Sequence, residues 1–214
     1  MNPPLRFKAL LTVMIASAGK LSLFVLISIA LLLAVKKITD PMVAEAERQT
    51  LLETLNQVMP TNLYDNDPLQ DTLWLTDPST LATLGSETPV LVYRARKNGK
   101  PAGLILTTIA PNGYTGNIYM LMSVLANNRV GGVRVLKHKE TPGLGDKIEL
   151  NKNNWILAFN NQTISEQTLQ AWAVKKDGGH FDQFTGATIT PRAVVGQVKR
   201  TLLLVKQQSE FLYE

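Results

Sequence analysis

The chain has 214 residues, of which 45% are hydrophobic, and a formal net charge of +5. This length is enough for one membrane anchor and one globular domain of ordinary size. The positive charge is spread along the chain without a zinc-finger, RNA-binding or helix-turn-helix signature, so we expect no nucleic-acid partner. The absence of cysteine excludes disulfides, thiolate nucleophiles and thiolate-held metal clusters. With two histidines a haem or histidine-rich metal site is not expected, so redox chemistry would need an organic cofactor.

An apolar segment near the amino terminus predicts a membrane anchor within residues 1–37. Leu21 to Val35 is an unbroken run of apolar and small residues. It covers roughly 22 Å at about 1.5 Å per residue, and residues 17–19 can extend it towards the roughly 30 Å hydrocarbon core. A cleaved signal peptide is the alternative, but Lys36 and Lys37 close the run where a small-x-small cleavage site would be needed.

Basic residues on both sides of this segment leave its orientation open. Three precede it and three follow it, namely Arg6, Lys8 and Lys20, then Lys36, Lys37 and Arg48. The positive-inside count is therefore a tie. The free amino terminus slightly favours an arrangement with the N-terminus in the cytoplasm.

The next segment, residues 38–88, reads as a helical linker followed by irregular structure. Asp40 and Pro41 give cap and first-turn signals for a helix whose apolar stripe continues to Val58, and Pro60 ends it. Asp-Pro pairs and mixed composition in residues 62–86 indicate mainly loop and short elements.

Residues 89–214 predict one α+β domain. Four strand-like runs are separated by turn signals at Asn98-Gly99, Asn112-Gly113-Tyr114 and Asn127-Asn128; the runs are Pro89 to Arg96, Gly103 to Ile109, Ile118 to Val124 and Val130 to Lys137. Consecutive strands with short turns favour an antiparallel sheet. A terminal helix from Pro191, with apolar residues at helical spacing, should pack across it.

The last strand leads directly into a loop rich in glycine. In His138 to Lys147, the residues Pro142-Gly143 and Gly145 force a tight turn whose backbone amides can point at a ligand. A glycine there also allows close approach of a ligand. The alternative is an ordinary surface loop between a strand and a helix.

A second motif, Asp182 to Pro191, predicts an anion site at a helix N-terminus. Thr190 has the character of an N-cap and Pro191 that of a first helical residue. Unpaired N–H groups and the helix dipole suit a phosphate, and Gly186 and Ala187 leave the backbone accessible. By spacing alone, a simple capped helix explains the same residues.

The sequence pattern Asp-x-x-Thr-Gly-Ala-Thr-x-Thr of residues 182–190 resembles the flavinylation motif of FMN-binding domains in bacterial redox pumps. The resemblance implies that Thr190, and not Thr185 or Thr188, carries FMN through a phosphoester made by a separate flavin transferase. Glu-Thr-Pro-Gly-Leu-Gly resembles the loop that lies against the flavin in the same family. The implied cofactor-binding residues are Thr190, Thr188, Ala187, Gly186, Thr185, Glu140, Thr141, Gly143 and Leu144.

The whole chain resembles the G subunits of Rnf-type (also called Rsx) ion-translocating electron transport complexes. This implies an electron carrier with covalent FMN, the other complex subunits as partners, and a bacterial inner-membrane location with the soluble domain on the periplasmic side. The alternatives are the C subunit of sodium-pumping NADH:quinone reductases, a stand-alone flavoprotein reductase, and an anchored scaffold without flavin. No residue is expected to be catalytic in the relay itself.

Between the two motifs, other side chains have open roles. Trp172 is suited either to stacking on a ring or to a core position, and Lys175 and Lys176 either to balancing a phosphate or to a solvated turn. For His138 we expect a structural hydrogen bond, and His180 gives weak evidence for a ligand or base.

Overall fold

The computed structural model describes the backbone of residues 3–214 and the side chains of residues 11, 14, 15 and 17–214. It divides into two compact units, Met1–Leu51 and Leu52–Glu214. The second unit begins well before residue 89, where the sequence suggested the domain boundary. The reason is tertiary, because Leu55, Val58 and Met59 are buried against the sheet.

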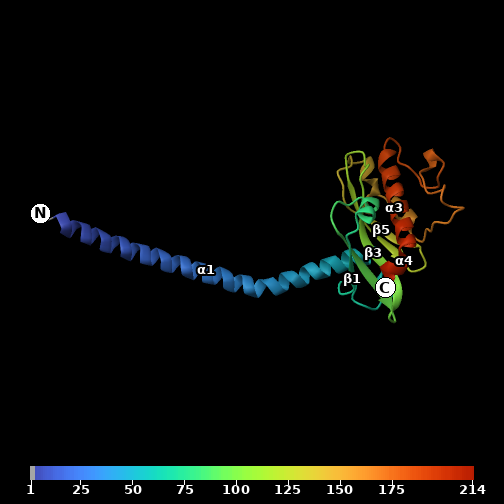
Figure 1. Cartoon of the computed structure of the whole chain (residues 1–214). Coiled ribbons are helices and arrows are strands. Elements are labelled where there is room, and N and C mark those ends of the chain that lie inside the picture. Colours follow the sequence, from blue (N-terminus) through green and yellow to red (C-terminus); the bar gives the residue numbers. More distant parts are fainter. Residues whose placement is uncertain (1–2) are drawn as a thin grey trace. The chain divides into compact units, whose positions relative to one another are not determined.

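The first unit is formed by most of one long helix, α1, which runs from Pro3 to Asn56 (Figure 1). Residues 52–56 of this helix belong to the second unit. From Ser17 onward α1 includes a stretch with mean hydropathy 2.4 that is not buried, so its length and composition suffice to cross a membrane. The prediction of a separate helix starting at Asp40 is wrong, since α1 continues through Pro41. Proline removes one backbone hydrogen bond but does not end this helix. Arg6 and Lys8, used in the charge count, lie outside the described side chains.

The second unit is built on a five-stranded antiparallel sheet in the simple order β1-β2-β3-β4-β5. The strands are β1 Thr72–Leu75, β2 Val90–Lys97, β3 Lys100–Ala110, β4 Ile118–Leu125 and β5 Val130–Lys137. The four predicted strands and the α+β class are confirmed. At the β2–β3 hairpin Asn98 and Gly99 both have positive φ, 51° and 72°, as the Asn-Gly signal predicted.

Residues 62–86, for which the sequence predicted mainly loop and short elements, contain one strand and one α-helix. Strand β1 adds an edge to β2, and α2, Pro78–Leu84, follows it. Asp77 caps α2 by accepting a hydrogen bond from the Thr80 N–H at 2.9 Å, and Gly85 ends it at φ 72°. These elements are short, so their periodicity is weak.

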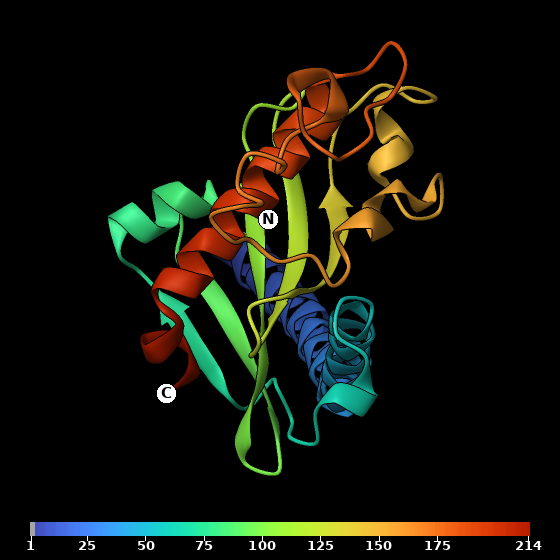
Figure 2. The same ribbon diagram turned by 90° about the vertical axis from the view of Figure 1, so that its right-hand side faces the viewer.

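Side chains alternate along β3 and face two separate hydrophobic clusters. Leu104 and Leu106 face the cluster that includes α3, Ile189–Gln207, whereas Ile105 faces Leu55 and Met59. Figure 2 shows α3 running across the strands of its face, as predicted. The remaining elements are α4 Ser209–Tyr213 and the 3-10 helices η1 Thr61–Leu63, η2 Gly145–Ile148, η3 Asn154–Phe159 and η4 Lys175–Asp177.

A buried polar network fixes the position of α3 on the sheet. The Gln197 amide donates to Thr108 Oγ1 of β3 at 2.6 Å and to the Thr83 carbonyl of α2 at 2.9 Å. Thr108 Oγ1 also lies 2.9 Å from Thr201 Oγ1. Because buried polar groups need partners, sliding α3 along the sheet would leave these groups unsatisfied.

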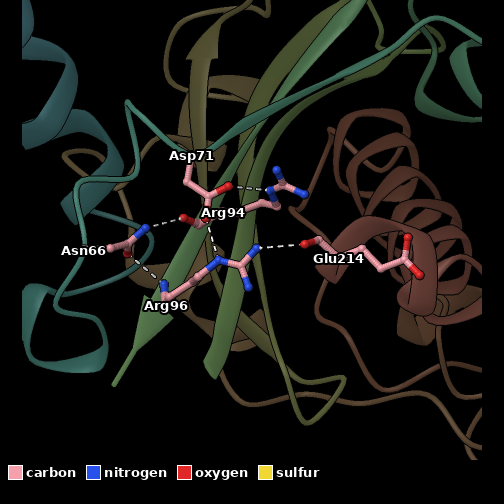
Figure 3. Close-up of polar contacts among 5 residues, drawn as sticks. All are labelled: Asn66, Asp71, Arg94, Arg96 and Glu214. Carbon is pink, nitrogen blue, oxygen red and sulfur yellow. Dashed lines mark hydrogen bonds and ion pairs between the residues drawn. The ribbon is translucent and has the colours of Figure 1, made fainter. Parts of the chain in front are cut away.

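A second polar cluster joins the segment just before β1 to β2 (Figure 3). It lies beside the first residues of β3, whereas the Gln197 network lies near the last residues of that strand. Asp71 accepts hydrogen bonds from Arg94 Nε at 2.7 Å and Arg96 Nε at 2.5 Å. Asn66 bonds to the backbone of both arginines, and Arg96 donates to the Glu214 carbonyl at 3.2 Å. Burial opposes ionisation of Asp71, but the arginine hydrogen bonds outweigh it and lower the pKa of its carboxyl.

The irregular segment between β5 and α3 is held by aromatic packing. Phe159 stacks on Phe181 with ring centroids 4.7 Å apart, and Trp155 meets Phe184 edge-on at 5.2 Å. Trp172 is 2% exposed and its Nε1 donates to the Thr163 carbonyl at 3.1 Å. Trp172 is therefore a core residue, and this packing places residues 182–191 at one end of the sheet.

Candidate functional site

Three segments far apart in the sequence meet where β3 ends and β4 begins. They are the β3–β4 loop, the loop after β5, and the start of α3. Together they line a cavity of about 300 Å³, within the range of small-ligand sites. Its lining residues are Tyr114, Glu140, Thr141, Leu144, Gly145, Gly186, Ala187, Thr188, Ile189 and Thr190.

The cavity gathers most of the residues that the sequence motifs singled out. Gly143 and Thr185 belong to the motifs but do not line it, whereas Tyr114, Gly145 and Ile189 line it without having been selected as binding residues. Tyr114 comes from the turn that separates β3 from β4, and no local signal marks it as a site residue.

Thr190 lies in the first turn of α3 and is fully buried. The prediction that Thr190 is the N-cap is wrong, because α3 begins at Ile189 and its N-cap is Thr188, which makes no side-chain cap bond. The Thr190 hydroxyl instead donates to Glu140 Oε2. The Thr190 hydroxyl therefore bonds to a side chain and does not cap a free backbone N–H of α3.

Glu140 is 4% exposed and collects hydrogen bonds from two other residues besides Thr190. Its Oε1 accepts from the Thr115 N–H and hydroxyl, both at 3.0 Å, and its Oε2 accepts from the Tyr114 N–H at 3.3 Å. Burial works against the charged carboxylate, yet these bonds prevail and lower the Glu140 pKa below its ordinary value. The site therefore holds an ionised carboxylate against the Thr190 hydroxyl at neutral pH.

His138 fixes the backbone at the start of this loop. Its Nδ1 accepts the Glu140 N–H at 2.9 Å, so the proton of the neutral ring is on Nε2, which lies 2.6 Å from Glu149 Oε1. His138 thus has the structural role that was expected. Since its ring nitrogens are both engaged within the loop, it holds Glu140 in place without touching Thr190.

The two glycines of the loop differ in their surroundings. A Cβ on Gly145 would lie 2.9 Å from Thr190 Oγ1 and 3.0 Å from Glu140 Oε2, so this position requires glycine for close packing. Gly143 has φ +78°, and a Cβ there would meet nothing within 4 Å. Gly143 therefore allows the positive φ of the turn, and Gly145 allows the close contact between the loop and α3.

The segment leading into α3 is stabilised by its own contacts. The Ala187 N–H donates to the Phe184 carbonyl at 3.0 Å, which closes a small turn around Gly186. Lys175 lies 2.5 Å from Asp182 Oδ1, and Arg192 forms a bidentate pair with Asp177 at 2.5 and 2.8 Å. Lys175 thus already has a carboxylate partner on the surface, which favours the solvated-turn interpretation.

Exposed apolar side chains surround the mouth of the cavity. Tyr114 is 66% exposed, Ile189 44% and Leu144 43%. A cavity with a buried hydroxyl and helix N-terminus at its base and an apolar rim fits a ligand with a phosphate at one end and a flat aromatic system at the other. Among the residues whose side chains are described, no group of His, Cys, Asp or Glu could hold a metal ion.

Comparison with known proteins identifies the class of domain and then the family. The FMN-binding domain model matches residues 113–203, which include all three segments of the site. Two curated relatives, each named as the G subunit of an ion-translocating oxidoreductase complex, are from Pseudoalteromonas atlantica and Vibrio cholerae. The first is 45% identical and covers 90% of this chain and 88% of its own length; the second is 42% identical and covers 90% of both.

A third relative with the same name, from Shewanella amazonensis, is 46% identical over 86% of this chain and 85% of its own length. The chain belongs to the family of ion-translocating oxidoreductase complex G subunits.

Proposed function

We propose that this chain is the electron-relay subunit of a membrane-bound, ion-translocating oxidoreductase complex and carries one FMN linked by a phosphoester to Thr190. The observation that carries the proposal is the cavity whose base holds the Thr190 hydroxyl within an FMN-binding domain. The names of the relatives place them in such a complex. They favour the G subunit over the C subunit of a sodium-pumping quinone reductase.

The residues of the site suit a bound flavin mononucleotide. Thr190 and the first N–H groups of α3 would hold the phosphate, with Thr185, Gly186, Ala187 and Thr188 supplying a backbone that allows close approach. FMN supplies an electron store that can pass one or two electrons, while the protein positions it. A covalent tether keeps the cofactor on the domain during repeated transfers between neighbouring subunits.

The loop from Glu140 to Leu144 and the rim residues would contact the flavin on its other sides. Glu140, Thr141 and Leu144 line the cavity, and Gly143 shapes the turn that presents them. Leu144, Tyr114 and Ile189 offer apolar surface for the ring system. Because these rim side chains are exposed, a ring packed on them stays near the surface, where an electron-transfer partner can approach.

Attachment requires a second protein and a local opening. The Thr190 side chain is buried and its hydroxyl is bonded to Glu140, so in this proposal a flavin transferase reaches it after a local movement, which we assign to residues 185–189. This segment is short and contains Gly186 and Ala187, which lowers the cost of such a movement.

In this proposal α1 crosses the bacterial inner membrane once, with its N-terminus in the cytoplasm and the FMN-binding domain in the periplasm. The helix is long and apolar enough for the crossing. A reporter active only outside the cytoplasm, fused after Glu214, should show activity. Activity of a cytoplasm-only reporter at the same position would reverse the orientation.

Mass spectrometry tests the covalent assignment. The protein is coexpressed with a flavin transferase, and trypsin releases residues 177–192, which contain Thr185, Thr188 and Thr190. Fragmentation should locate one FMN-phosphoryl addition on Thr190. Thr190→Ala should lose the addition, Thr190→Ser should retain it, and Thr188→Ala is the matched control that should also retain it. An addition on Thr185 or Thr188 would refute the assignment.

A further inference from the structure

Glu140 and Thr190 form a buried carboxylate–hydroxyl pair that joins the loop after β5 to α3. Glu140 is 4% exposed and Thr190 is fully buried. Burying a carboxylate carries a large desolvation penalty, and a neutral side chain would close the loop without it. Here the carboxylate is retained and its oxygen accepts the hydrogen of the one hydroxyl proposed to be esterified. A nucleophile bonded to an ionised base is the arrangement that activates hydroxyl groups.

We propose that Glu140 is the general base for flavin attachment and takes the Thr190 hydroxyl proton as that oxygen is esterified. The inference rests on the proposed phosphoester at Thr190. The co-reactant is a flavin dinucleotide, in which a phosphoanhydride joins the FMN half to a nucleoside monophosphate. The bond between Thr190 Oγ1 and the FMN phosphorus forms, and the phosphoanhydride P–O bond breaks. The nucleoside monophosphate leaves with the bonding electron pair, the proton goes to Glu140, and nothing is oxidised or reduced.

The same geometry dictates what happens to Glu140 after attachment. An esterified Thr190 oxygen has no hydrogen to donate, so Glu140 loses that bond and faces a phosphodiester carrying negative charge. Both changes disfavour the ionised carboxylate. Glu140 therefore keeps the proton and donates it in a hydrogen bond towards the ester, and its carboxyl pKa is higher in the flavinylated protein than in the unmodified one.

Of the groups that surround Glu140, only Thr190 is changed chemically by flavin attachment. The β3–β4 loop presents the Tyr114 N–H and the Thr115 N–H and hydroxyl, α3 presents Thr190, and the carboxylate's own loop contributes His138 through the backbone. Within the described part of the chain, Glu140 forms no ion pair. The titratable neighbours are Tyr114 and His138, and attachment alters neither of them chemically.

The test measures the initial rate of covalent flavin incorporation into purified full-length protein with flavin transferase and flavin adenine dinucleotide. Wild type, Glu140→Gln and Glu140→Asp are compared by in-gel fluorescence and intact mass. Asp71→Asn is the matched carboxylate-to-amide control, because Asp71 contacts β2 opposite the start of β3, away from the site. Thermal unfolding of each variant establishes that it is folded.

The expected result is a fall of about 100-fold or more for Glu140→Gln, a partial loss for Glu140→Asp and no change for Asp71→Asn. The ratio of the wild-type rate to the Glu140→Gln rate should decrease towards one as the pH falls through the Glu140 pKa. This ratio cancels the transferase's own pH dependence. Equal rates for wild type and Glu140→Gln would overturn the role of Glu140 while leaving the attachment site intact. No incorporation into wild type would overturn the attachment site, and this inference with it.

A second measurement needs no variant in the site. The Glu140 carboxyl carbon is titrated by NMR in unmodified and flavinylated wild-type protein, with its resonance assigned by through-bond experiments on the wild-type protein itself. A higher pKa in the flavinylated protein supports proton retention by Glu140. An equal or lower pKa contradicts it, even if Glu140→Gln fails to fold.

Discussion

Adding one methyl group at Gly145 tests whether the loop and α3 are packed as closely as the structure indicates. In Gly145→Ala the new Cβ would lie 2.9 Å from Thr190 Oγ1 and 3.0 Å from both Cβ and Oε2 of Glu140. Neither neighbour can swing into solvent, since Thr190 is fully buried and Glu140 is 4% exposed. We expect a loss of about 1–3 kcal/mol in the free energy of unfolding, typical of overpacking. For a chain of this size the melting temperature should fall by about 2–4 °C per kcal/mol.

Gly143→Ala is the matched control in the same loop. At φ +78° an L side chain costs about 1–2 kcal/mol, so the loss of stability should be similar. Its Cβ meets nothing within 4 Å, so the pair between Glu140 and Thr190 stays intact. The two variants therefore separate a general loss of stability from a specific disturbance of the site.

The assay combines thermal unfolding with covalent FMN occupancy, measured by intact mass after coexpression with a flavin transferase. Both variants should be destabilised, and only Gly145→Ala should lose occupancy. Equal loss of occupancy in both would mean that loading follows global stability. Full occupancy and an unchanged melting temperature in Gly145→Ala would refute the close packing of the loop on Thr190.

Three further perturbations test the Asp71 cluster and the mouth of the cavity. Asp71→Ala leaves Arg94 and Arg96 without their carboxylate and should lower the free energy of unfolding by about 1–3 kcal/mol in urea titration; an unchanged midpoint would show that the cluster is dispensable. The folded-state pKa of Asp71 and of Glu140 is lowered from the ordinary values of 3.8 and 4.5, so their stabilisation is complete above those values and is lost as pH falls through the folded pKa. Melting temperatures between pH 7 and pH 3 should therefore decline less steeply for Asp71→Asn than for wild type, and parallel curves would contradict the linkage. Tyr114→Ala should retain covalent FMN but change flavin fluorescence and reduction potential, because it removes exposed aromatic surface at the cavity mouth; identical values would place the ring elsewhere.

The sequence by itself determined the local elements whose signals are strong. The turn signals, Asn98-Gly99 above all, and the strand-like runs between them predicted the strands β2 to β5, since turn geometry is a property of neighbouring residues. The helical spacing of apolar residues after Pro191 placed α3 and its packing across the sheet. The two motifs pointed to the loops that line the cavity.

Only the tertiary structure decided which side chains meet there. Glu140 and Thr190 are brought together because α3 lies across the sheet in a register held by the Gln197 and Thr108 hydrogen bonds. Tyr114 joins them because the β3–β4 loop lies at the same end of the sheet. Local propensity gave Thr190 the signature of an N-cap, but a buried carboxylate from another loop offers its hydroxyl a stronger, charge-assisted bond. Contacts between residues fifty positions apart depend on packing, which no local pattern in the sequence specifies.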